Sequence, residues 1–215
     1  MTADPPGIRA IAEAMKRTAA ALRGADIPFA LGGSVAFWAR GGPETARDLD
    51  VVLRREDADA ALDALEAAGM QPERPPEGWL YKAWDGEVLV DLIWELSGLG
   101  EVGEALERSD EMTVAAVPVH VLSLEDTMVS KLLSLDEHHL DLEPSLRIAR
   151  AVREQVDWER VRARTADSPF ARAFLYLIET LGIAEPTPAA ADRPGPVVAR
   201  ATPIGRGSGV GRRPA

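Results

Sequence analysis

The chain has 215 residues, of which 46% are hydrophobic and 27% are charged, so its composition is that of a globular protein with one sizeable domain or two small ones. It contains no cysteine, which excludes disulfides, cysteine zinc sites and thiol nucleophiles. The net charge is −11, but five arginines against two acids give residues 184–215 a charge of +3 and leave −14 on the rest. Such a body repels long polynucleotides and favours a small neutral or cationic partner.

The apolar segments are all shorter than a membrane span. No uninterrupted apolar run could cross a bilayer, and the first ten residues, MTADPPGIRA, lack the apolar core of a signal peptide. We therefore expect a cytoplasmic location and no membrane partner, and the oligomeric state stays open.

The first seventy residues alternate between helical and strand-like patterns. Apolar residues recur with helical spacing first, and short β-type runs bounded by glycine follow. The expected elements are a helix at 8–22, a buried strand at 27–31, a short helix at 35–40 capped by Ser34, a strand at 47–53 and an amphipathic helix at 57–68.

A hairpin is expected in the next stretch, after a proline-rich loop at 71–78. Asp85-Gly86 separates two strand-like runs, 79–84 and 87–94, and Asp-Gly at such a position is a strong hairpin signal. The second run is apolar on both faces except for Asp91, which predicts a central strand. An unpaired buried carboxylate is costly, and a metal shared with Asp48 and Asp50 would explain an aspartate at position 91.

The second half of the chain is predicted to be mainly helical. A short helix is expected at 102–106, and the β-branched run at 112–122 contains Pro118, which favours an edge strand or a bulge. Ser123-Leu-Glu-Asp126 resembles a capping box and predicts a helix to about Leu135. Further helices are expected at 144–156, 158–164 and 169–182, and the Pro/Gly-rich stretch 184–215 is predicted to be disordered.

These elements predict an α/β (α+β) fold, with a mixed sheet flanked by helices and a helical C-terminal region. The expected domain organisation is a core at 1–122, helices at 123–183 and the tail at 184–215.

The stretch LGGSVAFWARGGPETARDLDVVL, residues 31–53, contains the most distinctive chemistry. Asp48 and Asp50 are two apart in a predicted strand, so both carboxylates point to one face. Two like charges this close need a cation, and hard oxygen ligands suit Mg²⁺ or Mn²⁺. Gly32, Gly33 and Ser34 form a turn before a helix, which favours phosphate. Metal and phosphate together indicate phosphoryl or nucleotidyl transfer.

The order GGS at 32–34, DLD at 48–50 and the Asp of VLVDLIW at 91 resembles the DNA polymerase β-like nucleotidyltransferase superfamily. The similarity is best to its minimal members, which include antibiotic nucleotidyltransferases and AbiEii-type toxins. The stretch SLEDTMVSKLLSL at 123–135 and the helices after it are similar to the AbiEii-like branch.

The resemblance implies a role for each matching residue. Asp48 and Asp50 would bind two Mg²⁺ ions, and Asp91 would complete one metal site and serve as, or orient, the general base. The residues implied to hold the β- and γ-phosphates of the NTP donor are Gly32, Gly33, Ser34 and Lys131.

Several alternatives stay open. The leading hypothesis is transfer of an NMP from an NTP to a hydroxyl of a small molecule; the others are a toxin-like enzyme modifying tRNA or protein, and a non-catalytic nucleotide-binding module. Lys131 is as compatible with a helix-surface lysine as with a phosphate contact. Arg147, Arg150 and Arg153 share one helical face that suits solvent more than substrate, and His138 and His139 diverge on a helix.

Overall fold

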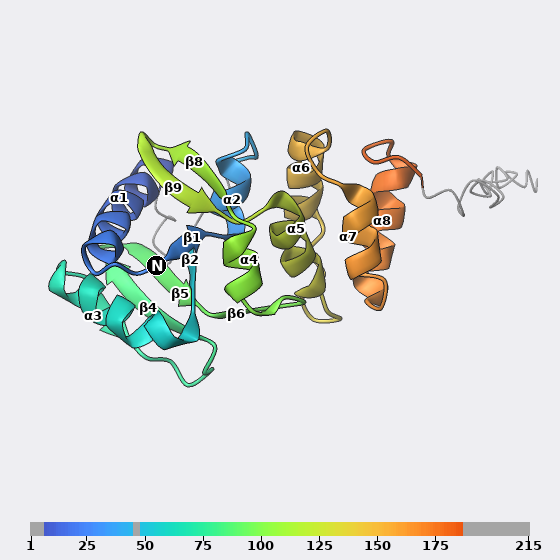
Figure 1. Ribbon diagram of the computed structural model, residues 1–215. Coiled ribbons are helices and arrows are strands. Elements are labelled where there is room, and N and C mark those ends of the chain that lie inside the picture. Colours follow the sequence, from blue (N-terminus) through green and yellow to red (C-terminus); the bar gives the residue numbers. More distant parts are fainter. Residues whose placement is uncertain (1–6, 45–47, 187–215) are drawn as a thin grey trace, which may run out of the picture. The chain divides into compact units, whose positions relative to one another are not determined.

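A seven-stranded mixed sheet forms the centre of the first half of the chain in the computed structural model, which describes residues 7–44 and 48–186 (Figure 1). The β2–β5 and β1–β9 pairs are parallel, and the other neighbouring pairs are antiparallel. The strands are, in order across the sheet, β3 (Gln71–Glu73), β4 (Leu80–Asp85), β5 (Val88–Ile93), β2 (Asp48–Leu53), β1 (Phe29–Leu31), β9 (Val117–Val121) and β8 (Asp110–Val114).

Two helices cover one face of this sheet. They are α1 (Ile8–Gly24) and α3 (Ala58–Ala67), the latter entered through a short 3-10 turn, η1 (Arg55–Asp57). Alternate residues of β2 point into the core beneath these helices, which includes Ile11, Met15, Leu22, Leu49, Val51, Leu53, Leu62 and Leu65. Because side chains alternate along a strand, Asp48 and Asp50 lie on the opposite face.

The opposite face is only partly covered. The short helix α2 (Gly33–Trp38) packs against β2, and α4 (Gly103–Glu107) lies over Val52. A separate two-stranded ribbon, β6 (Glu95–Leu96) with β7 (Gly100–Glu101), continues the chain between β5 and α4. This sparse covering leaves the aspartate face of β2 open.

The helical region begins after β9. Its helices are α5 (Leu124–Leu133), α6 (Glu143–Val152), α7 (Trp158–Arg164) and α8 (Pro169–Thr180) (Figure 1). Ser123 caps α5 as the sequence predicts, because its side chain accepts a hydrogen bond from the Asp126 N–H. Asp157 and Ser168 cap α7 and α8 in the same way. The helices share a second core with Phe37 of α2, so this core joins the helical region to the helix that packs against β2.

The predicted α/β fold is confirmed, and two local predictions are wrong. Residues 71–73 form strand β3 instead of a loop, because they pair with β4 along the outer edge of the hairpin. The run 112–122 belongs to a hairpin whose turn places Ala115 and Ala116 at positive φ, and because β9 pairs with β1 only at Val121, Pro118 lies where β9 has a strand partner on one side alone among the described residues, as the edge prediction expects. The N-cap of α2 is Gly32, not Ser34.

Other predictions lie partly outside the described residues. Arg47 and residues 187–215 are not described, so the expectation of a disordered tail is untested there, although Ala184 is buried against the second core. Residues 1–185 form one compact unit, and the division at residue 122 stays a prediction. Among the described residues, no helix is long and apolar enough to cross a membrane.

A buried ion cluster stabilises α5 against its neighbours. Asp126, in the first turn of α5, is fully buried, and its carboxylate contacts Arg108 at 3.3 Å and Arg164 at 2.7 Å. Burial by itself raises the pKa of Asp126, but hydrogen bonds from both guanidinium groups outweigh it and hold that pKa below its usual value. The ionised carboxylate therefore links α5 to the end of α4 and to α7.

Asp126→Asn should lower the free energy of unfolding at pH 7 by about 3 kcal/mol, because it removes the charge that two arginines share. A carboxylate with a lowered pKa stabilises the fold above its unfolded pKa of about 3.9, and this contribution is lost as the pH falls through the folded value. Urea denaturation at pH 7 and pH 3 should show the difference shrinking in acid. Asp63→Asn, at a side chain that is 72% exposed, is the matched control and should have little effect at either pH.

Candidate active site

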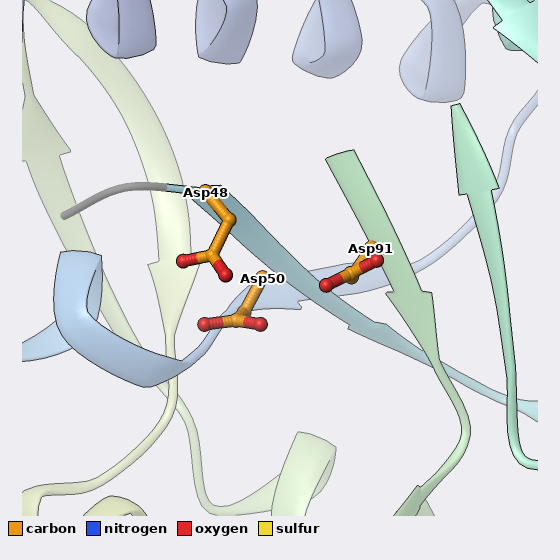
Figure 2. Close-up of side chains that lie close together, drawn as sticks. All are labelled: Asp48, Asp50 and Asp91. Atoms are coloured by element: carbon orange, nitrogen blue, oxygen red, sulfur yellow. The ribbon is translucent and has the colours of Figure 1, made fainter. Parts of the chain in front are cut away.

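Three aspartates converge on the open face of the sheet (Figure 2). Asp48 and Asp50 are alternate residues of β2, and β2 pairs in parallel with β5 so that Asp50 lies directly beside Asp91. One oxygen from each carboxylate lies within 4.8 Å of the others. The structure thus brings together the three residues that the sequence singled out, from two strands about forty residues apart.

The turn before α2 lies against Asp50. The Gly32 N–H donates a hydrogen bond to the Asp50 carbonyl at 2.9 Å. Gly33 has φ +51°, and a Cβ on it would stand 1.7 Å from Asp50 Oδ2. Both the positive φ and the lack of space require glycine at this position. Next to it, Ser34 Oγ is buried without a hydrogen-bond partner among the described residues.

The close approach of the carboxylates changes their proton affinities. Burial, followed by repulsion from Asp48 and Asp91, raises the pKa of Asp50 to about 7, against the opposing effect of Lys131 and Lys82. Burial also raises the pKa of Asp91, and Lys82 opposes that shift. Burial lowers the pKa of Lys131, although Asp50 favours its charged form. Burial is thus the largest cause of all three shifts, and repulsion among the carboxylates adds to it for Asp50 and Asp91.

Lys82 is a site residue that the sequence prediction missed. It lies on β4 directly opposite Asp91, and its Nζ is 3.4 Å from Asp91 Oδ1. The contact is an ion pair, and no residue that the structure describes forms a hydrogen bond with Asp91 Oδ1. The hairpin register contains the signal that could have found Lys82, since a tight turn that pairs Asp85 with Val88 also pairs Lys82 with Asp91.

A cleft of about 1320 Å³ opens beside the aspartates. It is lined by Gly33, Ser34, Asp48, Asp50 and Lys131 together with residues of the 77–79 loop, β6 and the start of α6. Asp91 is not among the lining residues, and its side chain is 12% exposed. The charged residues that line the cleft are seven acids and two bases: Glu44, Asp48, Asp50, Glu77, Glu95, Asp141, Glu143, Lys131 and Arg147.

Other candidates fall outside this arrangement. Arg147 lines the cleft and pairs with Glu143 at 3.7 Å, whereas Arg150 and Arg153 are exposed and do not line it. His138 and His139 are strongly exposed after the end of α5 and do not converge on the aspartates.

Solved structures with the same fold include nucleotidyltransferases. The solution structure of the antibiotic-resistance factor ANT(2'')-Ia is 19% identical, covers 80% of this chain and 96% of that chain, and has a TM-score of 0.54. The crystal structure of ANT(2'')-Ia in complex with adenylyl-2''-tobramycin is also 19% identical, with coverages of 77% and 97% and a TM-score of 0.53. An antigenic nucleotidyltransferase-like protein from Paracoccidioides brasiliensis is 15% identical, with coverages of 83% and 91% and a TM-score of 0.50. No curated protein matches the sequence significantly.

The mixed sheet, with a glycine turn against two aspartates of one strand and a third on the next, has the architecture of a minimal nucleotidyltransferase. A family model described as "Uncharacterised nucleotidyltransferase" matches residues 9–182, so the chain belongs to this family. It is therefore a nucleotidyltransferase, and the predicted enzyme class and superfamily are confirmed. The individual roles of the site residues stay predictions.

Gly33→Ala should displace the Asp50 carboxylate and reduce nucleotidyl transfer at least 100-fold, because the new methyl group occupies the position of Oδ2. Gly86→Ala is the matched control, since Gly86 has φ +64° and open space around it. Both variants should lose about 1–2 kcal/mol of stability from backbone strain, measured by denaturation, but only Gly33→Ala should lose activity. Equal activities in the two variants would show that the close approach of Gly33 to Asp50 does not matter for nucleotidyl transfer.

Asp50→Asn should stabilise the metal-free protein more at pH 8 than at pH 5. A carboxylate whose pKa is raised to about 7 in the folded state binds a proton more tightly there than in the unfolded chain. Stability of the wild type therefore falls as the pH rises from about 4, the unfolded pKa, to 7. Thermal unfolding in the presence of a chelator should show that the asparagine variant lacks this decline. Asp63→Asn should leave the pH profile unchanged.

Proposed function

We propose that this protein is a metal-dependent enzyme that transfers an NMP from an NTP to a hydroxyl group of a small-molecule acceptor. The observation that supports this most strongly is the convergence of Asp48, Asp50 and Asp91 within 4.8 Å beside a glycine turn. A nucleotide-binding module without chemistry would have no use for three mutually repelling carboxylates.

The carboxylates fit a divalent cation. Their oxygens are hard ligands of the kind that Mg²⁺ or Mn²⁺ prefers, and Asp91 Oδ1 is buried without a hydrogen bond from any described residue. Asp48 and Asp50 would bind two such ions, and Asp91 would complete one of the two metal sites. When bound, the metal would neutralise charge on the attacked phosphate and lower the pKa of the acceptor hydroxyl.

The residues around the metal ligands would position the donor. Gly32, Gly33 and Ser34 would hold the β- and γ-phosphates, with the unpartnered Ser34 Oγ as a donor, and Lys131 would contact the same phosphates from α5. The acceptor oxygen attacks the α-phosphorus, and the bond from that phosphorus to the bridging oxygen of pyrophosphate breaks. Asp91 would accept the proton of the attacking hydroxyl, or would orient the general base that accepts it.

The cleft suggests the chemistry of the acceptor. Glu77 and Glu95 line it and have no ion-pair partner among the described residues, and Trp79 lies between them in sequence with 41% of its surface exposed. These groups suit a small molecule with ammonium groups and a flat or sugar-like face, and they disfavour a polyanion such as tRNA. ANT(2'')-Ia, which has a similar fold, was solved in complex with adenylyl-2''-tobramycin, and this supports the proposal of a small-molecule acceptor.

Pyrophosphate release measures this function directly. Wild-type protein, an NTP and Mg²⁺ should release pyrophosphate only when an acceptor is present, in a panel of amine-bearing, neutral and acidic hydroxyl compounds and tRNA. Amine-bearing compounds should be the best acceptors. Asp48→Asn should reduce the rate at least 1000-fold, because it removes one of the three carboxylates that would hold the metal, and chelation should do the same.

Lys16→Met serves as the control, since Lys16 is an exposed residue of α1 that pairs with Glu13. If Asp48→Asn retained the wild-type rate, the proposed mechanism would be wrong, and if tRNA were the preferred acceptor, the proposed substrate class would be wrong.

A further inference from the structure

Four charged side chains form a row across adjacent strands. Strand register places Glu73 of β3 opposite Lys82 of β4, Lys82 opposite Asp91 of β5, and Asp91 beside Asp50 of β2. Directly paired residues share a face of the sheet, so the four side chains point the same way. The row reads acid, base, acid, acid, with the lysine as the only cation on these paired strand positions.

Lys82 contacts the carboxylate that the metal requires. Its Nζ is 3.4 Å from Asp91 Oδ1, and in the described part of the chain Asp91 is the only group with which it forms an ion pair. The lysine side chain is 25% exposed and the aspartate side chain 12% exposed, so water screens the pair incompletely. An ammonium ion on Asp91 and a divalent ion on the same carboxylate repel each other, and they therefore compete.

Glu73 offers Lys82 a second partner on the other side. The glutamate is exposed, and its Oε2 accepts a hydrogen bond from Trp84 Nε1 at 3.1 Å. Trp84 lies two residues after Lys82 on the same strand, so this bond keeps the Glu73 carboxylate on the face to which Lys82 points. A lysine side chain is long and rotatable enough to move between carboxylates on the two neighbouring strands.

We propose that Lys82 is a positioning residue that occupies Asp91 until the metal arrives and then moves to Glu73. In the metal-free protein, Lys82 neutralises part of the three-carboxylate cluster. It also weakens the binding of a free divalent ion at Asp91. This inference depends on the proposed metal site. It adds that a metal ion binds Asp91 only when it displaces Lys82.

The test uses Mn²⁺ alone, titrated without nucleotide into the metal-free full chain and followed by the electron paramagnetic resonance of free Mn²⁺. Lys82→Met should bind Mn²⁺ about 5- to 10-fold more tightly than the wild type, because the competing cation is gone. Lys82→Arg, which keeps the charge, should bind like the wild type or more weakly. Glu73→Gln should bind Mn²⁺ more weakly than the wild type, because Lys82 has lost its alternative partner.

A structural role of Lys82 predicts a different pattern. In an Asp91→Asn background, Lys82→Met should change Mn²⁺ affinity less than twofold, since the competition acts through Asp91. A gain of the same size in both backgrounds would reject the proposal, as would Lys82→Met binding no more tightly than the wild type. If Lys82→Met failed to fold, Glu73→Gln would still decide the question, because unchanged or tighter binding in that variant contradicts the exchange.

The proposed function has its own criterion. If the wild type and Asp48→Asn bound Mn²⁺ equally, the metal site itself would be rejected. If Asp48→Asn abolished Mn²⁺ binding while Lys82→Met left it unchanged, the role of Lys82 alone would be rejected.

Discussion

The repulsion among Asp48, Asp50 and Asp91 is the constraint on which the rest of this structure depends. Three carboxylates with oxygens within 4.8 Å are unfavourable in a partly buried setting, and burial, together with repulsion from Asp48 and Asp91, raises the pKa of Asp50. The sheet can hold them there because two parallel strands fix their register through backbone hydrogen bonds, and because a large core on the other face stabilises those strands. Because the fold holds these three carboxylates close together, a divalent cation that binds them relieves their mutual repulsion.

The surroundings of the carboxylates divide between two tasks. Gly33 brings backbone against Asp50, and Ser34 Oγ beside it has no hydrogen-bond partner among the described residues. Lys82 of β4 and Lys131 of α5 supply positive charge to the same carboxylate. Lys131 lies on α5, whose first turn is tied to the rest of the molecule by Asp126 and its two arginines. The helical region therefore contributes to the site as well as to the core, because residues of α5 and α6 line one side of the cleft.

Local signals in the sequence predicted most of the fold. Apolar periodicity, the Asp85-Gly86 turn and the capping residues located the helices and the hairpin within a few residues. The errors arose where tertiary pairing decided the outcome. Residues 71–73 became a strand because β4 had a free edge to pair with. The turn between β8 and β9 was not predicted either, because it places Ala115 and Ala116 at positive φ, which alanine rarely adopts.

The sequence by itself determined the identity and the facing of the two aspartates of β2, because a spacing of two in a strand puts side chains on one face. It also indicated Asp91 as a charge without a local partner. Only the tertiary structure decided that Asp91 lies beside Asp50 and that Gly33 has no room for a methyl group. The reason is physical: strand order and register depend on hydrogen bonds between segments distant in the chain, and local periodicity does not encode them.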